Sequence, residues 1–182
     1  DYSRIVNNKH YSRLSELIEK STIAGAQLFM GGENDSSSNY ISPTILTDID
    51  KNSPIMKEEI FGPILPVITF KELSEATAFI NEKPKPLGLY IFSKRTKNID
   101  FILENTSAGS TCINDTILHY MHLNLPFGGV NTSGFGRTGG SSGFQAFSNQ
   151  RSVMKQSTIS PMRLLYPPYT PRVKTFIKLV LK

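Results

Sequence analysis

Short apolar segments and segments of helical periodicity alternate from Tyr11 to Ile113, and this alternation limits the possible folds more than any other feature of the chain. Apolar residues spaced three and four apart predict helices, here in residues 11–18, 74–80 and 99–103. Short runs rich in β-branched, aromatic and aliphatic residues predict strands, here in residues 26–30, 63–70, 89–92 and 110–113. Strands that alternate with helices are typical of an α/β fold with a largely parallel sheet.

Individual residues mark where these elements begin and end. Gly25 follows the first helix and is expected to stop it, whereas Ser74 is expected to cap the second. Pro66 has no amide hydrogen to donate, so the first half of its strand is expected to lie at a sheet edge or to be irregular. Loops are predicted at residues 31–39 and 126–143, and a further strand at residues 150–155.

Positive charge is concentrated at the C-terminal end of the chain, whose net charge is +5 at neutral pH. Residues 151–182 hold seven basic side chains and no acid, while residues 1–150 hold 13 basic and 15 acidic side chains. A nucleic-acid-binding surface would spread lysine and arginine over a folded domain with aromatic residues between them. The distribution therefore argues against nucleic acid as a partner.

The basic end of the chain also has the pattern of an amphipathic helix. Residues at i, i+3, i+4, i+7 and i+8 form one apolar stripe, namely Val173, Phe176, Ile177, Val180 and Leu181. A parallel basic row consists of Lys174, Lys178 and Lys182. We predict a helix of about three turns. It lies on an anionic membrane surface, docks on the protein itself or forms a solvated end of the chain.

Sequence features that direct a chain across a membrane are not seen. No segment approaches the ~18 apolar residues of a spanning helix, and the first residues lack the apolar core of a signal peptide. Cys112 is the single cysteine, which excludes an internal disulfide and favours a reducing compartment. We expect a cytoplasmic protein, membrane-associated at most through its C-terminus. The first residue is Asp1 and not methionine, so the chain is expected to start within a longer protein.

Two glycine patterns resemble phosphate-binding loops but lack the required context. Residues 134–139 fit G-x-G-x-x-G, yet the segment before them is not a strand, and no acid follows Asp115 to bind a ribose. Residues 129–134 have the glycine spacing of a P-loop, but Phe135 stands where a lysine is needed. We therefore interpret this region as a tight loop whose glycines permit close backbone packing.

Other reactive side chains are better explained by structure than by chemistry. Cys112 lies within a strand-like apolar stretch, where a buried cysteine usually acts as a small hydrophobe. His119 and His122 are spaced to share a helix face, but a metal site needs a third ligand, and Asp115 is the one acid nearby. We expect no metal. Adjacent residues on an extended chain point to opposite sides, so Glu58-Glu59 is not expected to act as an acid/base pair.

Several local strings, taken in order, resemble the C-terminal catalytic region of aldehyde dehydrogenases. They are Tyr40-Ile-Ser-Pro-Thr-Ile-Leu46, Glu58-Glu-Ile-Phe-Gly-Pro63, Asn114-Asp115, Leu125-Pro-Phe-Gly-Gly-Val130 and Ser133-Gly-Phe-Gly136. Residues 87–93 and the later Tyr166-Pro-Pro-Tyr169 point to the class 3 branch, which includes fatty aldehyde dehydrogenases. The similarity extends from about Asp1 to about Thr170.

The resemblance implies roles for six side chains. The carboxylate of Glu59 would accept hydrogen bonds from the hydroxyls of the nicotinamide ribose of NAD or NADP. Phe61 would lie on the same side of an extended segment and pack near the nicotinamide ring. The entrance for medium- or long-chain aliphatic or aromatic aldehydes would be lined by Ile117, Tyr120, Met121 and Phe127. By residue type alone, Glu58-Glu59 would be a solvated pair and Phe61 a core residue.

The resemblance also implies a domain organisation. Residues 1–135 would belong to the three-layer catalytic domain, residues 136–157 would form a return segment with an oligomerisation strand, and residues 158–182 a C-terminal extension. Within the return segment, residues 152–156 would pair with a neighbouring subunit in a homodimer.

The catalytic nucleophile is expected outside this chain. In the family a cysteine attacks the aldehyde, hydride passes to NAD(P)+, and water hydrolyses the thioester. The resemblance places that cysteine, the general-base glutamate and the oxyanion asparagine before Asp1, and Cys112 does not match the nucleophile motif. We therefore expect the chain alone to be inactive. The alternative is a truncated, non-catalytic homologue that acts as an oligomerisation or membrane-contact module.

Overall fold

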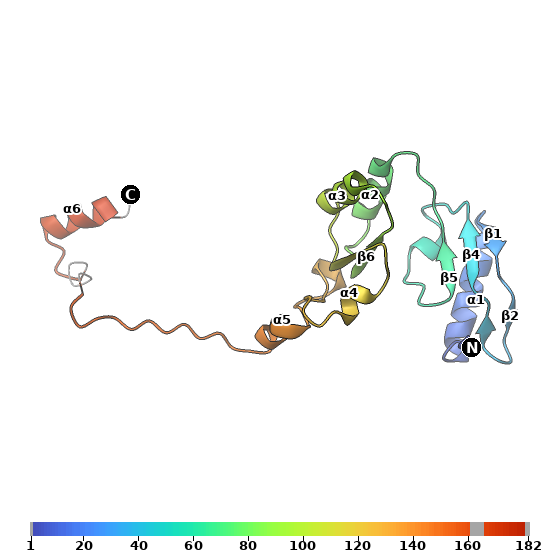
Figure 1. Ribbon diagram of the computed structural model, residues 1–182, viewed down its shortest axis with the longest axis horizontal. Helices are drawn as coiled ribbons and strands as arrows, with labels where there is room; N and C mark the ends of the chain where they lie inside the picture. The colour runs from blue at the N-terminus through green and yellow to red at the C-terminus, as the bar shows by residue number, and fades with distance from the viewer. Residues whose placement is uncertain (1, 161–165, 181–182) are drawn as a thin grey trace. The chain divides into compact units, whose positions relative to one another are not determined.

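The computed structural model describes residues 2–160 and 166–180, and they form two units (Figure 1). The first unit contains Asp1–Lys83 and Arg95–Thr106, and the second contains Pro84–Lys94 and Ser107–Lys182. This partition follows contacts within the chain and does not test the predicted boundaries at residues 135 and 157, which stay a prediction.

The first helix, α1 (Asn8–Ile23), confirms the helical periodicity around Leu14. The side chain of Asn7 caps it by accepting a hydrogen bond from the amide of His10 at 3.0 Å. The helix ends before Gly25, whose φ of 105° is costly for other residues. Its buried face carries the predicted residues Tyr11, Leu14 and Leu17.

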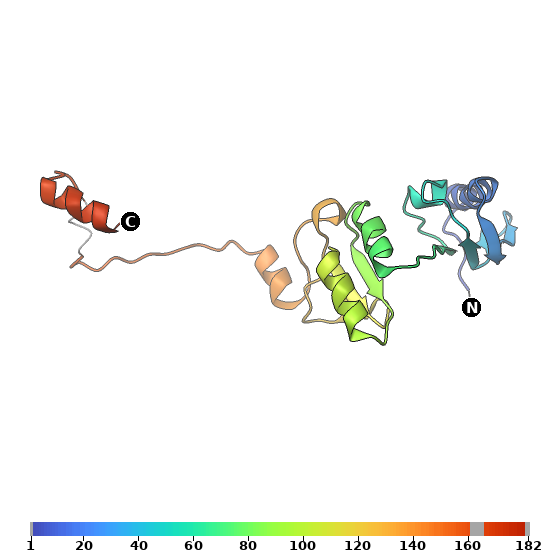
Figure 2. The ribbon, with the colours of Figure 1, turned by 90° about the horizontal axis from the view of Figure 1, so that it is seen from above.

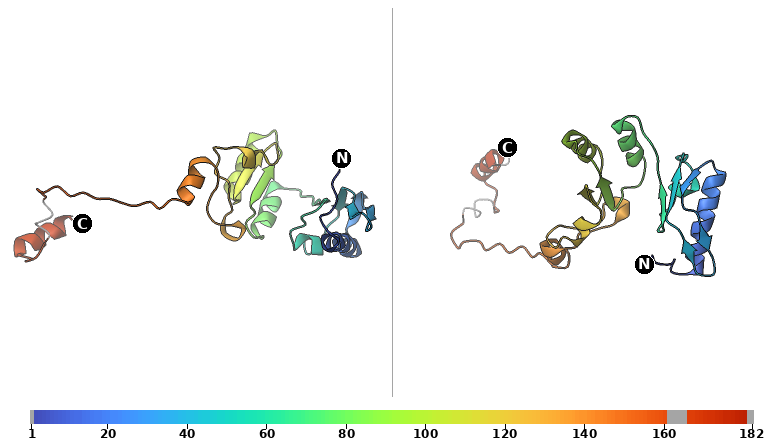
Figure 3. Two further views of the ribbon diagram at one scale, coloured as in Figure 1. Left: turned by 90° about the horizontal axis from the view of Figure 1, so that it is seen from below. Right: turned by 45° about the vertical axis from the view of Figure 1, so that its right-hand side comes forward.

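A three-stranded sheet packs against this helix (Figures 1 and 3). Its order is β1 (Gln27–Met30), β4 (Thr44–Thr47) and β5 (Ile64–Pro66), with β1 antiparallel and β5 parallel to β4. Leu46 of β4 and Ile55 of η1 (Pro54–Met56) join the side chains of α1 in one hydrophobic core. Strand β4 is an element that the sequence patterns did not predict.

The strand predicted at residues 63–70 is shorter than expected. Only Ile64–Pro66 pairs as a strand, and it lies at the edge of the three-stranded sheet, as expected for Pro66. The amide of Val67 still donates to the carbonyl of Leu46 at 2.9 Å, and regular pairing ends there.

The predicted loop at residues 31–39 contains part of a small hairpin, which corrects the sequence interpretation. Strand β2 (Asn34–Asp35) pairs antiparallel with β3 (Tyr40–Ile41). The Asp35 carboxylate holds the turn by accepting bonds from the hydroxyls of Ser38 at 2.6 Å and Ser37 at 2.7 Å. These bonds, Ser38 first, hold the pKa of the Asp35 carboxyl below its usual value. The polar side chains that suggested a loop therefore build the turn of a hairpin.

Two helices complete the first unit, α2 (Leu73–Asn81) and α3 (Thr96–Asn105). Both were predicted, but the N-cap of α2 is Glu72 and Ser74 lies inside the first turn, so the predicted cap is wrong. The helices are joined by a 2.7 Å hydrogen bond from the side-chain amide of Asn81 to the carbonyl of Asn105.

The second unit is built on two parallel strands, β6 (Gly88–Ile91) and β7 (Ser110–Ile113) (Figure 2). Both agree closely with the predicted strands, and together with the β4–β5 pair they confirm an α/β fold with parallel pairing. The region predicted as one glycine-rich loop holds η2 (Asn131–Ser133) and the start of the helix α5 (Gly140–Ala146). Helix α4 (Leu118–Met121) lies between β7 and that loop.

The C-terminal helix is present, but the strand predicted before it is not formed. Helix α6 (Pro171–Val180) confirms the amphipathic pattern as far as it is described, and Leu181 and Lys182 lie outside the described residues. Residues 149–157 adopt neither helix nor strand (Figure 3). Their pairing with a neighbouring subunit requires a second chain and stays a prediction.

Candidate active-site surfaces

The segment that carries Glu59 is attached to helix α1 through Arg13. The guanidinium Nη2 donates to the carbonyl oxygen of Ile60 at 2.6 Å, and Nη1 approaches the carbonyl oxygen of Glu59 at 3.5 Å. Nη1 also pairs with Oε2 of Glu58 at 3.1 Å. One side chain of α1 therefore holds three consecutive residues of a segment without regular secondary structure.

Among the described residues, one of the two adjacent carboxylates has a partner and the other has none. That of Glu58 is paired with Arg13, whereas the carboxylate of Glu59 makes no hydrogen bond or ion pair with any residue of 2–160 or 166–180. Glu59 is also exposed to solvent. An ionised carboxylate with both oxygens unoccupied can accept two hydroxyl hydrogen bonds.

Phe61 occupies an unusual backbone conformation at the next turn of the segment. Its φ is 47°, in the left-handed region that is costly for a bulky residue. Because the segment is not extended at this point, the alternation that was expected to place Phe61 beside Glu59 does not apply. The ring is 84% exposed and borders a hollow of about 330 Å³ with Arg4, Ile5, Val6 and His10.

Gly62 and Pro63 fix the end of this turn. A Cβ atom at Gly62 would lie 2.6 Å from a methyl group of Leu14, so the backbone can rest on α1 here because the residue is glycine. On the other side, the amide of Thr44 donates to the carbonyl of Pro63 at 2.8 Å. The Glu59–Phe61 turn is thus anchored at both ends while its two side chains stay exposed.

The predicted aldehyde-contact residues lie in the second unit, after the end of β7. Asn114 closes that end, since its side-chain oxygen accepts from the amide of Ser93 at 2.8 Å and its amide donates to the carbonyl of Ser93 at 3.0 Å. Ile117 follows with a φ of 65° and starts α4. Ile117, Tyr120 and Met121 are all exposed.

Aromatic contacts connect α4 to Phe127. The rings of Tyr120 and Phe127 are 5.0 Å apart between centroids, and His119 lies 5.6 Å from Phe127 and 5.5 Å from Tyr90. Such edge-on and tilted arrangements are favourable for aromatic rings. The structure therefore brings the rings of Tyr120 and Phe127 into contact, while their part in an aldehyde entrance stays a prediction. Sequence patterns did not indicate Tyr90, because β6 lies far from α4 along the chain.

The two histidines of this region do not form a pair. His119 is 8% exposed, and both its ring nitrogens are buried without a hydrogen-bond partner among the described residues. His122 lies beyond the last residue of α4, is exposed, and accepts from the amide of Asn124 through Nδ1 at 3.3 Å. The possibility that they share one helix face is therefore wrong.

The glycine-rich loop holds Phe127 by hydrogen bonds between its own two ends. The amide of Phe127 donates to the carbonyl of Thr138 at 2.9 Å, and the amide of Thr138 donates back at 2.7 Å. Arg137 donates from Nη1 to the carbonyl of Gly128. The turn η2, and not a strand, precedes Gly134, so the residues that fit G-x-G-x-x-G occupy a closed loop without the context of a dinucleotide site.

Cys112 lies in the middle of β7, opposite Tyr90 in the parallel pair. Its thiol is in a side chain that is only 9% exposed. This setting agrees with the interpretation of Cys112 as a small hydrophobe.

Comparison with known proteins gives the family. A sequence model described as the aldehyde dehydrogenase family matches residues 1–153. The chain belongs to the aldehyde dehydrogenase family. It is 45% identical over 172 residues to aldehyde dehydrogenase family 3 member A2 of Rattus norvegicus, covering 92% of this chain and 34% of that protein. The class 3 resemblance is therefore confirmed.

Solved aldehyde dehydrogenases share the fold. A substrate-bound state of Staphylococcus aureus AldH matches with a TM-score of 0.86 and 42% identity, over 100% of this chain and 39% of that one. A Mycobacterium tuberculosis aldehyde dehydrogenase complexed with NAD+ matches with a TM-score of 0.78 and 28% identity, over 88% and 33% of the two chains. This chain thus spans about a third of the length of its aldehyde dehydrogenase relatives.

Family membership groups the chain with oxidoreductases, and the matched Mycobacterium tuberculosis structure is complexed with NAD+. Within residues 2–160 and 166–180, none of the helices combines the length and apolar character needed to cross a bilayer. Glu59 and Phe61 belong to the first unit and the four aldehyde-contact candidates to the second. A channel shared by the two sets stays a prediction.

Proposed function

We propose that this chain is the C-terminal segment of an NAD(P)-dependent aldehyde dehydrogenase that oxidises medium- or long-chain aliphatic or aromatic aldehydes to carboxylic acids. The observation that carries the proposal is the anchored turn at Glu59–Phe61, where a carboxylate and a ring are both exposed although the backbone between them is fixed. A fixed, unpaired carboxylate is costly to folding only where it is buried, and at the surface it is ready to bind a ligand.

In this proposal Glu59 and Phe61 bind the nicotinamide half of the cofactor. The two oxygens of the Glu59 carboxylate accept the two ribose hydroxyls. The ring of Phe61 packs near the nicotinamide and limits its orientation for hydride transfer. The left-handed backbone at Phe61 supports this role, because strain of this kind is often found where a side chain must be directed toward a ligand.

The aldehyde would be bound by Ile117, Tyr120, Met121 and Phe127. Their exposed apolar surface supports an aldehyde with a hydrocarbon chain or ring, because little hydrogen bonding is offered to a polar tail. Tyr120 and Phe127 contact each other edge-on, so they form a stable wall and not two independent side chains.

Turnover measurements test the assignment. We expect no NAD(P)H from this chain with saturating decanal or benzaldehyde, because Cys112 is its single cysteine and is buried in β7. A polypeptide that also contains the in-frame upstream region is expected to oxidise these aldehydes. We expect it to be a homodimer in sedimentation experiments and to be found in the cytoplasmic fraction of cells. Activity of this chain that survives Cys112→Ser would contradict the proposal.

A non-catalytic oligomerisation or membrane-contact module is the alternative. It predicts that the complete polypeptide also fails to oxidise aldehydes, and that no cysteine and glutamate motif is encoded upstream. Residues 149–157, which are exposed and form no strand in this structure, would suit either a module or an enzyme subunit. The upstream coding sequence and the turnover of the complete polypeptide therefore separate the two functions.

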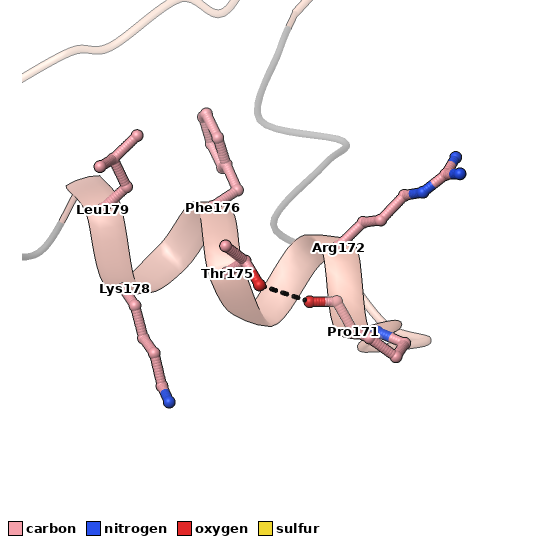
Figure 4. A pocket seen from close by; sticks show the side chains of 6 residues that line it. All are labelled: Pro171, Arg172, Thr175, Phe176, Lys178 and Leu179. Atoms are coloured by element: carbon pink, nitrogen blue, oxygen red, sulfur yellow. Dashed lines mark hydrogen bonds between the residues drawn. The ribbon is translucent and has the colours of Figure 1, made fainter.

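We also propose that α6 makes peripheral contact with an anionic membrane surface. Figure 4 shows Phe176 and Leu179 projecting from one side of the helix and Lys178 from the other. Arg172 and Lys174 add positive charge, and no acid follows Asp115 in the sequence. A helix with exposed apolar side chains and a basic face can insert at the level of lipid headgroups.

Co-sedimentation with vesicles tests this contact. We expect the chain to sediment with phosphatidylserine vesicles at low salt and not with phosphatidylcholine vesicles, because attraction by lysine and arginine falls off within a Debye length. The double variant Lys174→Gln/Lys178→Gln should lose about thirtyfold in affinity, as each basic residue contributes about 1 kcal/mol. If the chain stays in the supernatant at low salt, docking of α6 on the protein itself is the better explanation.

A further inference from the structure

We infer that Arg13 is a positioning residue for the nicotinamide cofactor, because it fixes the backbone that carries Glu59. The inference rests on the proposed function of Glu59. Arg13 lies on α1 and precedes Glu58 by 45 residues in the sequence, so no local pattern links the two.

Arg13 donates more hydrogen bonds to main-chain carbonyl groups than to charged side chains. Its shortest bond joins Nη2 to the carbonyl oxygen of Ile60 at 2.6 Å, in a partly buried position. Its ion pair with Glu58 is more open, since the two side chains are 28% and 44% exposed, and exposed ion pairs contribute little. Removal of the guanidinium would leave carbonyl groups of Glu59 and Ile60 without this donor.

Arg13 also separates the two neighbouring carboxylates. By pairing with Glu58 it holds that side chain beside α1, while the carboxylate of Glu59 has no partner in the described part of the chain. Lysine cannot replace this arrangement, because its single ammonium group lacks the planar fork that reaches several acceptors at once. The left-handed turn at Phe61 begins immediately after the residue that Arg13 holds most closely.

The experiment uses the isotopically labelled chain and nicotinamide mononucleotide as the probe, because this molecule contains the nicotinamide ribose without the adenosine half. Nicotinamide alone is the control compound. Amide shifts measure binding, and backbone order parameters measure how rigid residues 59–62 are. In the unsubstituted chain we expect the probe to shift Glu59–Gly62 and the order parameters to lie at about 0.85.

Four variants separate the positioning role from the ligand role. Arg13→Gln is expected to weaken binding of the probe about tenfold, consistent with loss of a charge-assisted hydrogen bond. It is also expected to lower the order parameters of residues 59–62 below about 0.6. Arg13→Lys should also lower the order parameters of residues 59–62. Glu59→Gln should weaken binding of the probe about as much as Arg13→Gln does, without changing the order parameters. Glu58→Gln, which breaks the ion pair alone, should stay within about twofold.

The amides of Leu14 and Leu46 report whether the core of a variant remains folded, and Arg13→Lys serves if Arg13→Gln does not fold. Order parameters and probe binding that are unchanged in both Arg13 variants would overturn the inference alone. So would a Glu58→Gln variant that reproduces the full effect, because the ion pair would then be responsible. A probe that fails to shift the unsubstituted chain would instead overturn the proposed function of Glu59, and with it the functional part of the inference.

Discussion

Replacement of Gly129 by alanine is expected to destabilise the second unit by about 3 kcal/mol, at the upper end of the usual cost of inserting a group into a filled site. A Cβ atom at Gly129 would lie 2.1 Å from the carbonyl oxygen of Ser133 and 2.4 Å from the amide nitrogen of Gly134. Both are backbone atoms, so no side-chain rotation can relieve the clash. The loop around η2 must open, and the Phe127–Thr138 hydrogen bonds would be strained with it.

Hydrogen exchange of the β6 and β7 amides in increasing urea measures this effect, because these strands form the sheet of the second unit. Gly143→Ala is the matched control. Its Cβ atom would meet no neighbour closer than 3.7 Å, and it lies within α5, where alanine is favoured over glycine by about 0.8–1.0 kcal/mol. Equal stability of the two variants would show that the close approach at Gly129 does not exist.

Leu14→Ala is expected to destabilise the first unit by about 2–5 kcal/mol, the usual range for leucine in a close-packed core. The side chain is 0% exposed and lies in the cluster that includes Leu17, Leu46 and Ile55. It also supports the backbone at Gly62, next to Phe61. The cavity left by alanine would therefore loosen the turn that carries the proposed cofactor contacts as well as the core.

Hydrogen exchange of the β4 amides, measured in increasing urea, gives the loss in stability. Ile23→Ala on the same helix is the control, because Ile23 is 78% exposed and its replacement should change the free energy of unfolding by less than about 0.5 kcal/mol. A cost below about 1 kcal/mol for Leu14→Ala would mean that the site collapses around the smaller side chain.

Sequence patterns predicted the elements whose signals are local. The periodicity of α1, α3 and α6 and the apolar runs of β1, β6 and β7 all identify real elements, because each depends on residues a few positions apart. Strand β4 and the β2–β3 hairpin were not predicted. Their polar or mixed segments become strands only when remote partners are present, such as Tyr11, whose hydroxyl donates to the side chain of Asn34 at 2.7 Å.

The candidate site shows the same division. The strings around Glu59 and Phe127 are recognisable in the sequence, and the family they indicated is confirmed by the match over residues 1–153. The alternation of an extended chain does not apply at Phe61, whose φ is 47°, so a shared side for Glu59 and Phe61 stays a prediction. Arg13 and Tyr90 were not identified, since their contacts join residues distant in sequence.

The amino-acid sequence by itself determined the α/β class and the family and indicated candidate site residues, since these follow from local pattern and residue type. Only the tertiary structure decided which of those side chains are free to act. Arg13 pairs with Glu58 and leaves Glu59 unpaired, and His119 is buried while Tyr120 beside it is exposed. The physical reason is that hydrogen bonding and burial depend on distance in space, and distance along the chain does not specify it.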